Sequence, residues 1–437
     1  MRYLLVICLV ACTSRDVIVG DLQEVTSLKA VPDRDLDILF VVDNSPSMIE
    51  EQQALATSFP LMIDRLATLD DGLPDLHIGV VTSDLGTSGS LTPPAPPVGT
   101  VGNGGCGDMG MAGNLVQVAG MSARFLSDIA APGGTRTTNF TGELRDAFGA
   151  LALVGDLGCG FEQHLGAMRR ALDSNPTNAG FLRDDANLAV VILADEDDCS
   201  VADSAFFGSD PSLGPLQSFR CFRYGVQCDG DDPLTPGAKT NCHPRPASPY
   251  LDEVAPFADF LVNIKVDPRK VMVAGVVGDP MPVAVELATP PGGGTPIPTL
   301  SHSCSYGGAI GAQVADPAVR LASFVDQFPG RSRLTSICSA DLSDAVSDIG
   351  ASAKRLMGDP CLTQAVFTDT CDVTDVRDSA PDAPAHLPSC SDGGPDCFEI
   401  VADPAACPSS ADHLRVVIHR SSAAAPDTWT HVRCQAR

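Results

Sequence analysis

The sequence predicts an α/β protein with a doubly wound, mostly parallel sheet, long loop insertions and a small disulfide-rich β module at its C-terminal end. Three almost uninterrupted apolar runs predict the sheet, and they lie at residues 37–43 (DILFVVD), 188–194 (LAVVILA) and 271–277 (VMVAGVV). Such runs are typical of strands that are covered on both faces. The segments between them have helical periodicity, and this alternation of strand and helix is characteristic of the fold class.

A helix is expected directly after the first strand. Its apolar positions fall three or four residues apart on one face, at Leu55, Phe59, Ile63 and Leu66. Pro60 is expected to bend this helix, because proline lacks the backbone N–H that the helix interior requires. Residues 76–82 (LHIGVVT) then predict a second buried strand, and residues 141–153 and 162–172 predict helices.

The later helices follow the second and third apolar runs. Residues 251–262 predict a helix between the runs at 188–194 and 271–277. Asp316 is expected to cap another helix, with Pro317 at its first position. The last helix of this domain is expected over residues 342–356.

Residues 35–358 are therefore expected to form one domain. Three insertions interrupt it, at about residues 86–135, 199–249 and 279–315, where glycine and proline are frequent and periodicity is lost. Residues 359–437 are expected to form the disulfide-rich β module, because they hold six cysteines and alternate apolar side chains at Leu414, Val416 and Ile418.

Composition excludes some function classes. The 437 residues are 44% hydrophobic, which suffices for buried cores, and they carry a formal net charge of -27. A charge of this sign repels phosphate backbones, so nucleic acid is not an expected partner.

The N-terminus has the order of an export signal. An apolar run at residues 4–11 follows Arg2 and ends in Leu9-Val10-Ala11-Cys12, which resembles a bacterial lipoprotein signal with its lipobox. The resemblance implies a signal over residues 1–11, cleavage before Cys12, a lipid on Cys12 and a tether over residues 12–34. It also implies attachment to the bacterial envelope, with the outer membrane expected. The run is far too short to span a bilayer as a helix, and a buried N-terminal strand is the alternative.

The cysteine count agrees with export. Of 16 cysteines, Cys8 would leave with the signal and Cys12 would carry lipid, so 14 remain, enough for seven disulfides of open connectivity. The alternative is a zinc site, for which four side chains are candidates: Cys221, Cys228, Cys242 and His243.

A candidate metal site follows the first predicted strand. Asp43, Ser45 and Ser47 form the pattern D-x-S-x-S, which places one carboxylate and two hydroxyls at alternate positions of one loop. Open α/β sheets bind ligands at the carboxyl ends of their strands. Oxygen ligands suit hard divalent cations, with Mg²⁺ expected first and Ca²⁺ or Mn²⁺ as alternatives. The competing interpretation is ordinary turn and helix-capping chemistry.

Two segments together suggest a family. Residues 37–48 (DILFVVDNSPSM) and 190–195 (VVILAD) resemble the von Willebrand factor type A domain and its metal-ion-dependent adhesion site. The resemblance covers about residues 35–358. It implies that Ser45 and Ser47 bind the ion directly, and that Asp43 and Asp195 bind it directly or through water.

The match departs at the family's second-loop threonine, where Glu162 stands in this chain. A carboxylate there would put Asp43, Glu162 and Asp195 around one divalent ion. Such a site should bind the ion without help from a partner, and it should attract a partner's acidic group less, because the ion is already more than neutralised. The alternative is that Glu162 is an exposed acid at the start of a helix.

Three further acids are expected near the same edge of the sheet: Asp84, Asp197 and Asp279. They would either steer a partner or solvate their loops.

Enzyme motifs are missing from the sequence. No Gly-x-Ser-x-Gly, HExxH or GxxxxGK(S/T) pattern occurs, and His164 is expected to be an exposed helix residue. A metal-dependent phosphohydrolase with Asp43 as nucleophile is the main alternative, although only Lys265 and Lys270 flank a predicted core strand. The expected function is non-catalytic, cation-dependent binding of an unidentified protein or surface polymer at the envelope. A structural protein with a fold-stabilising metal is the third possibility.

Overall fold

The computed structural model describes residues 23–31, 33–69, 72–131, 134–230, 232–290, 293–309, 311–407 and 410–437. It divides into two compact units, of which the larger spans residues 31–359 and the smaller combines residues 23–30 with residues 360–437. The predicted signal segment and Cys12 lie outside the described residues.

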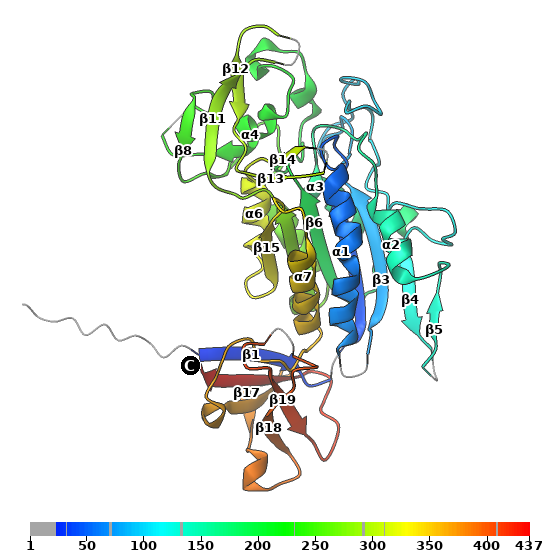
Figure 1. Cartoon of the computed structure of the whole chain (residues 1–437), viewed down its shortest axis with the longest axis vertical. Coiled ribbons are helices and arrows are strands. Elements are labelled where there is room, and N and C mark those ends of the chain that lie inside the picture. The colour runs from blue at the N-terminus through cyan, green and yellow to red at the C-terminus, as the bar shows by residue number, and fades with distance from the viewer. Residues whose placement is uncertain are drawn as a thin grey trace, which may run out of the picture. The chain divides into compact units, whose positions relative to one another are not determined.

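The larger unit is built on one seven-stranded sheet (Figure 1). In spatial order its strands are β15 (Ser332–Ser336), β10 (Val271–Val277), β6 (Asn187–Ala194), β2 (Asp35–Val42), β3 (Asp75–Thr82), β4 (Leu126–Ala130) and β5 (Arg136–Thr138). The first five are parallel, and β4 and β5 continue the sheet as antiparallel strands. The register pairs Val42 with both Thr82 and Leu193, so β2, β3 and β6 end level with one another.

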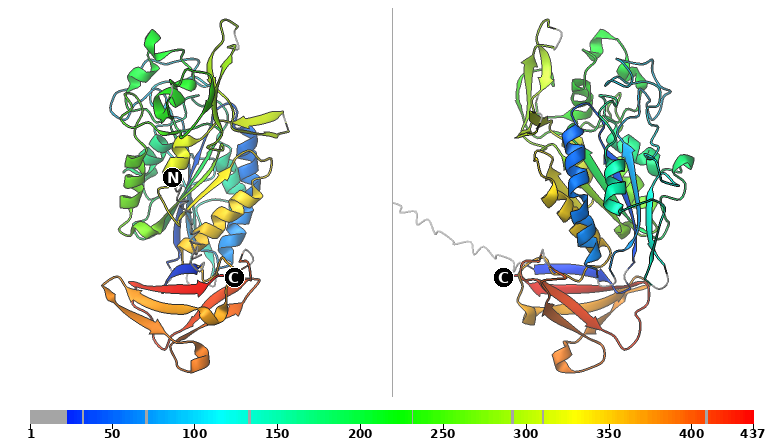
Figure 2. Two further views of the ribbon diagram at one scale, coloured as in Figure 1. Left: turned by 90° about the vertical axis from the view of Figure 1, so that its left-hand side faces the viewer. Right: turned by 45° about the vertical axis from the view of Figure 1, so that its right-hand side comes forward.

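Helices cover both faces of this sheet, as Figures 1 and 2 show. One face holds α1 (Ile49–Ala67), α2 (Leu144–Ala152) and α7 (Ser343–Leu356), and the other holds α3 (His164–Leu172), α5 (Ala255–Ile264) and α6 (Val319–Val325). Alternate residues of β2 serve the two cores, with Phe40 in one and Leu39 in the other. This arrangement confirms the predicted doubly wound α/β fold. No helix in the described part of the chain is long and apolar enough to cross a membrane.

Pro60 lies inside α1, which continues past it to Ala67. Proline costs this helix one backbone hydrogen bond. The apolar face compensates, because Leu55, Phe59 and Leu66 are almost fully buried against the sheet. Phe59 stacks on Phe148 of α2 with ring centroids 3.7 Å apart.

The long connections all follow carboxyl ends of parallel strands, because they leave β3, β6 and β10. Two of them gather at the top of Figure 1. They carry α4 (Phe219–Gly225) and the short strands β7 (Val226–Gln227), β8 (Gly237–Lys239), β9 (His243–Pro244), β11 (Val283–Ala288), β12 (Ile297–Leu300), β13 (Cys304–Gly307) and β14 (Ala312–Ala315).

The first expected insertion, at residues 86–135, is partly a strand of the sheet. Residues 126–130 form β4, whose Asp128 accepts a hydrogen bond from Arg136 Nε at 2.6 Å. A five-residue strand that contains a paired acid lacks the apolar run by which the central strands were recognised.

The predicted cap of the helix after Asp316 was wrong. This helix, α6, begins at Val319, and the Asp197 carboxylate accepts from the backbone N–H groups of Arg320 and Leu321 at 2.9–3.0 Å. Asp316 instead lies 2.7 Å from His302 Nδ1. The carboxylate that caps the start of α6 therefore comes from Asp197, which lies on another loop, and not from Asp316.

The fourteen cysteines pair as predicted, in seven disulfides. The bonds are Cys106–Cys159, Cys199–Cys221, Cys228–Cys242, Cys304–Cys338, Cys361–Cys407, Cys371–Cys434 and Cys390–Cys397. The alternative zinc site is therefore wrong, because three of its four ligands are oxidised. Disulfides in this number are typical of proteins in an oxidising compartment outside the cytosol.

The smaller unit is a β structure, as predicted for the C-terminal region. Its sheet has the order β1 (Gln23–Lys29), β20 (Thr428–Gln435), β16 (Asp372–Arg377) and β17 (Ala380–Leu387), and β18 (Cys397–Ala402) pairs with β19 (Leu414–His419). The tether expected over residues 12–34 needs correction, because residues 23–29 are a strand of this sheet. Leu28 joins its core, and the carboxylate of Glu24, 4% exposed, accepts hydrogen bonds from Thr363.

Ion pairs fix the amino end of the central strand β2. Asp37 is fully buried, and its Oδ1 accepts from Arg183 Nε at 2.8 Å. Lys265 Nζ lies 3.6 Å from the other Asp37 oxygen, and Lys270 Nζ lies 2.6 Å from Asp33 Oδ2. Both lysines that flank a core strand are therefore bound at the amino edge of the sheet.

Candidate metal centre

Asp43 is the first residue after β2, and both its backbone and its side chain make contacts that hold it in place. Its backbone N–H donates to the Leu193 carbonyl of the neighbouring strand at 3.0 Å. The side chain is fully buried. Its Oδ1 accepts from the Ser45 N–H at 2.7 Å, and its Oδ2 lies 3.3 Å from His164 Nε2. The carboxylate is thus held at the carboxyl edge of the sheet.

The two serines of the pattern lie beside it. Ser45 is buried and Ser47 is exposed, and their hydroxyl oxygens are 3.1 Å apart. Ser47 also hydrogen-bonds the carboxylate of Asp195, which directly follows the adjacent strand β6. The structure therefore brings together Asp43, Ser45, Ser47 and Asp195 from two neighbouring strand ends.

Glu162 reaches the same cluster from the connection between α2 and α3. This connection is attached to the D-x-S-x-S loop, because the Gly158 N–H donates to the Asn44 carbonyl at 2.8 Å. Glu162 is 1% exposed, and its carboxyl group hydrogen-bonds that of Glu196. Burial, then the charges of Glu196 and Asp43, raise the Glu162 pKa well above its usual value. It is not the exposed acid at the start of a helix that the alternative interpretation required.

Three contributors were missed or misread in the sequence. His164 was expected to be exposed, but it is fully buried against Asp43. Burial lowers the His164 pKa, but the hydrogen bond and charge of Asp43 outweigh burial, so the pKa is raised. Glu196 was not singled out, although it follows Asp195. Glu51, on α1, is 2% exposed, and its Oε1 accepts from the Tyr306 hydroxyl at 2.8 Å. Glu51 follows Ser47 by four residues, about one helical turn, and this spacing in the sequence could have indicated that the two side chains lie on the same side.

Several buried polar atoms of this cluster have no hydrogen-bond partner. They are Glu51 Oε2, Glu162 Oε1, His164 Nδ1 and Asp195 Oδ1. An unsatisfied buried polar group costs about 1–3 kcal/mol, and more when charged, so such groups call for a ligand, an ion or bound protons. Burial and the charges of Asp43 and Glu196 raise the Asp195 pKa well above its usual value. The residues fit a hard divalent cation, because three of these four unsatisfied atoms are carboxyl oxygens, the ligand type that such cations prefer.

The carboxylates do not form a closed cage. Among the described residues, no three carboxylates of this cluster bring ligand oxygens within 4.8 Å of one another. Opposite ligands of Mg²⁺ are about 4.2 Å apart, so direct ligation by three carboxylates would require movement. The serine hydroxyls with one carboxylate, and water for the rest, fit the arrangement as it stands.

The three predicted rim acids have different roles. Asp84 is half-buried, and its Oδ1 accepts from the Gly86 N–H at 2.8 Å, which shapes its own loop. Both oxygens of Asp197 bind the first turn of α6, so Asp197 is not free to steer a partner. Asp279 is half-buried two residues beyond β10.

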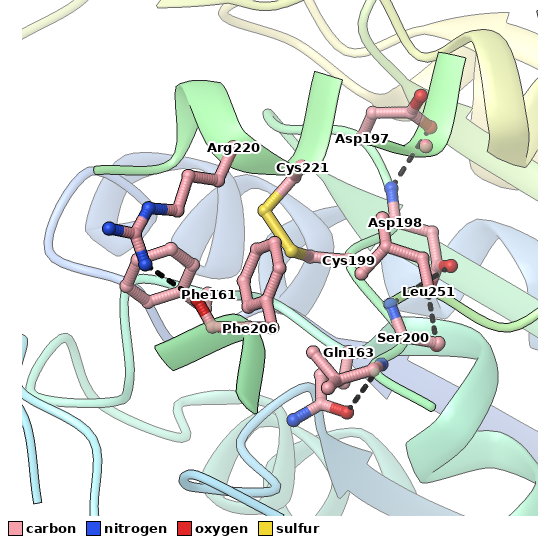
Figure 3. Close-up of a disulfide and its surroundings, with 12 residues drawn as sticks. Phe161, Gln163, Asp197, Asp198, Cys199, Ser200, Phe206, Arg220, Cys221 and Leu251 are labelled. Carbon is pink, nitrogen blue, oxygen red and sulfur yellow. Dashed lines mark hydrogen bonds between the residues drawn. A yellow bond between two sulfur atoms is a disulfide. The ribbon is translucent and has the colours of Figure 1, made fainter. Parts of the chain in front are cut away.

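The segment after Asp195 is tightly attached to the Glu162 connection. Figure 3 shows the Cys199–Cys221 disulfide close to Phe161 and Phe206. The Glu162 carbonyl accepts from the Cys199 N–H at 2.8 Å, and Gln163 Oε1 accepts from the Val201 N–H at 3.0 Å. Two loops that carry acids of the cluster are therefore held in one position.

Metal-free protein is expected to lose stability as the pH rises from 4.5 to about 7. Burial, then the charges of Asp316 and Asp43, raise the Glu196 pKa from 4.5 to about 7. The folded state therefore holds a proton that the unfolded chain releases, so this stabilisation is complete below pH 4.5 and is lost through about pH 7. At about 1.4 kcal/mol per pKa unit, the loss is on the order of 3 kcal/mol.

Melting temperatures measured in EDTA from pH 4.5 to 7.5 check this expectation. Glu196→Gln should show a shallower decline than wild type, because the glutamine does not titrate. Identical slopes for the two proteins would contradict the assignment.

Comparison with known proteins finds similarity at the level of solved structures. No protein-family model matches the chain, and no curated protein matches it. A von Willebrand factor type A protein from Catenulispora acidiphila is 11% identical, with 96% of this chain and 62% of that chain covered and a TM-score of 0.29. BatB from Bacteroides thetaiotaomicron is 10% identical, with coverages of 74% and 98% and a TM-score of 0.26. The pilus adhesin RrgA from Streptococcus pneumoniae is 10% identical, with coverages of 97% and 60% and a TM-score of 0.30.

The structural neighbours thus include a type A protein and a pilus adhesin. This chain spans less than two thirds of the length of either of these two structures. Similarity at these TM-scores carries no argument about function, which rests on the geometry of the acidic cluster.

Proposed function

We propose that this protein is a non-catalytic, envelope-anchored lipoprotein that binds another macromolecule in a divalent-cation-dependent way. The observation that carries the proposal is the convergence of Asp43, Ser45, Ser47 and Asp195 at one sheet edge, next to buried carboxyl oxygens without partners. Mg²⁺ is the cation that fits best, and Mn²⁺ or Ca²⁺ are alternatives.

The ligand roles follow from exposure and contact. Ser45 and Ser47 would bind the ion through their hydroxyls, and Asp43 and Asp195 would hold it directly or through water. Glu162 takes the place of the threonine in the type A pattern. Three carboxylates exceed the charge of one divalent ion, so the ion would bind without a partner's acidic group.

A non-catalytic role is supported by where the lysines that flank a core strand lie. Asp43, the nucleophile that a phosphohydrolase would use here, has the Ser45 N–H and His164 beside its two oxygens. Lys265 pairs with Asp37, which lies on β2 six residues before Asp43. At a rise of about 3.3 Å per residue, Lys265 is therefore about 20 Å from Asp43. A phosphohydrolase would need such a cation beside the phosphate.

The partner would be a protein or surface polymer of the envelope. The connections after β3, β6 and β10 surround the cation site and offer it a contact surface. The seven disulfides support export. Anchoring by a lipid on Cys12, to the outer membrane, completes the proposal.

The proposal is tested by cation-dependent capture. Immobilised oxidised protein is incubated with solubilised envelope material in Mg²⁺, washed, and eluted with EDTA, beside a Ser47→Ala variant. We expect a component that wild type retains and EDTA releases, with retention by Ser47→Ala reduced about tenfold or more. Hydrolysis of para-nitrophenyl phosphate that depends on Mg²⁺ and Asp43 would instead establish the phosphohydrolase. A rise in melting temperature with Mg²⁺, without any retained component, would indicate a structural metal.

A further inference from the structure

A cavity of about 380 Å³ lies beside the acidic cluster. One wall carries the acids Glu162, Glu196, Asp197 and Asp316, and the others come from two insertions, with Phe219, Phe222 and the β11–β12 hairpin. This volume is within the usual range for sites that bind small molecules or single side chains, about 300–1,000 Å³.

The four acids are not equally available. Asp197 binds backbone N–H groups of α6, and Asp316 lies 2.7 Å from His302 Nδ1. Glu162 and Glu196 remain, and both line the cavity. Glu162 Oε1 is buried without a partner, and Glu162 lines the cavity. The open acceptor at the polar end therefore belongs to this pair.

The other walls complement a cation with an apolar body. Among the residues that the structure describes, no lysine or arginine lines the cavity. Phe222 and Leu300 are 6% and 7% exposed and form a packed apolar wall. Lysine and arginine have this same division, with an aliphatic stem that packs on apolar surface and a head that seeks acceptors and negative charge.

We propose that this cavity takes a basic side chain, lysine or arginine, of the protein partner. The stem lies against the apolar wall, and the charged head binds Glu162 and Glu196. The inference rests on the proposed function, because it supplies the chemistry of the partner that binds at this edge of the sheet.

A bound divalent ion leaves this preference in place. Five carboxyl groups meet here, from Asp43, Glu51, Glu162, Asp195 and Glu196. A divalent ion displaces the protons that these groups hold in its absence. Fully ionised, their five negative charges exceed the two charges of the ion and the one of a protonated His164. The cavity thus favours a cationic group over an acidic one, since like charges repel strongly where water is excluded.

Ligand-observed NMR with small probes tests the proposal. The probes are the N-acetyl amides of lysine, arginine, norleucine and glutamate, each titrated in saturating Mg²⁺ and in EDTA. Lysine and arginine are expected to bind roughly tenfold or more tightly than norleucine, and glutamate is expected not to bind. Glu196→Gln and Glu162→Gln should each weaken the basic probes about tenfold. Asp259→Asn, which removes an exposed charge on α5, should have no effect.

Equal binding of lysine and norleucine probes, or preference for glutamate, would overturn the proposal. So would equal weakening by Asp259→Asn and Glu196→Gln. Calorimetry measures Mg²⁺ binding in the same samples, so the cavity proposal and the cation-site proposal can fail separately.

If the basic probes bind but Mg²⁺ does not, the cavity proposal stands and the proposed cation dependence is refuted. If Mg²⁺ binds but the basic probes do not, only the cavity proposal is refuted.

Discussion

Asp43→Ala is expected to abolish divalent-cation binding, with an affinity at least about 100-fold below wild type. Asp43 is the carboxylate at the centre of the cluster, because it contacts Ser45 and His164 and its charge acts on Glu162 and Asp195. Calorimetric titration of Mg²⁺, Mn²⁺ and Ca²⁺ into chelator-treated, oxidised protein measures the effect.

Asp279→Ala is the matched control, since it removes one half-buried acid after a neighbouring strand. It should bind the ion within about twofold of wild type. Glu162→Thr should bind the ion more weakly, because it removes one of three carboxylates. Retained affinity in Asp43→Ala would refute the site, and unchanged affinity in Glu162→Thr would exclude Glu162 from the ion.

Asp198→Ala is expected to lower the free energy of unfolding of the larger unit by about 3–5 kcal/mol. Asp198 is fully buried, and its Oδ2 accepts from Arg320 Nη2 at 2.9 Å, while Arg320 is 1% exposed. The same carboxylate accepts from the Leu165 N–H at 2.9 Å and the Ser200 hydroxyl at 2.6 Å. Removing it leaves a buried guanidinium whose hydrogen-bond partners are the Asp252 and Gly225 carbonyls.

Urea unfolding followed by circular dichroism measures this loss. Asp173→Ala is the control, because Asp173 forms an exposed pair with Arg169 on α3 and should cost at most about 0.5 kcal/mol. If both variants lose the same small amount, Arg320 does not depend on Asp198. Replacing Asp198 and Arg320 together with apolar residues should recover part of the stability, because the unpaired charge is then gone.

Local pattern predicted much of the larger unit. The strands β2, β3, β6 and β10 were each found within two residues, because a strand buried on both faces is apolar throughout. The edge strand β15 (SRLTS) was not, since its side chains are half-buried or exposed. Strand β1 was mistaken for a tether because its partner β20 lies some four hundred residues away, beyond any local periodicity.

The candidate site divides in the same way. By itself, the sequence determined the fold class, the even cysteine count and the D-x-S-x-S loop, because strand burial and loop chemistry are encoded in adjacent residues. Only the tertiary structure decided the disulfide partners, the burial of His164 and the position of Glu51 and Glu196 beside Asp195. It also decided that Asp197 accepts hydrogen bonds from the start of α6. These depend on which strand ends lie level with one another and which loops cross there, and no local spacing specifies that.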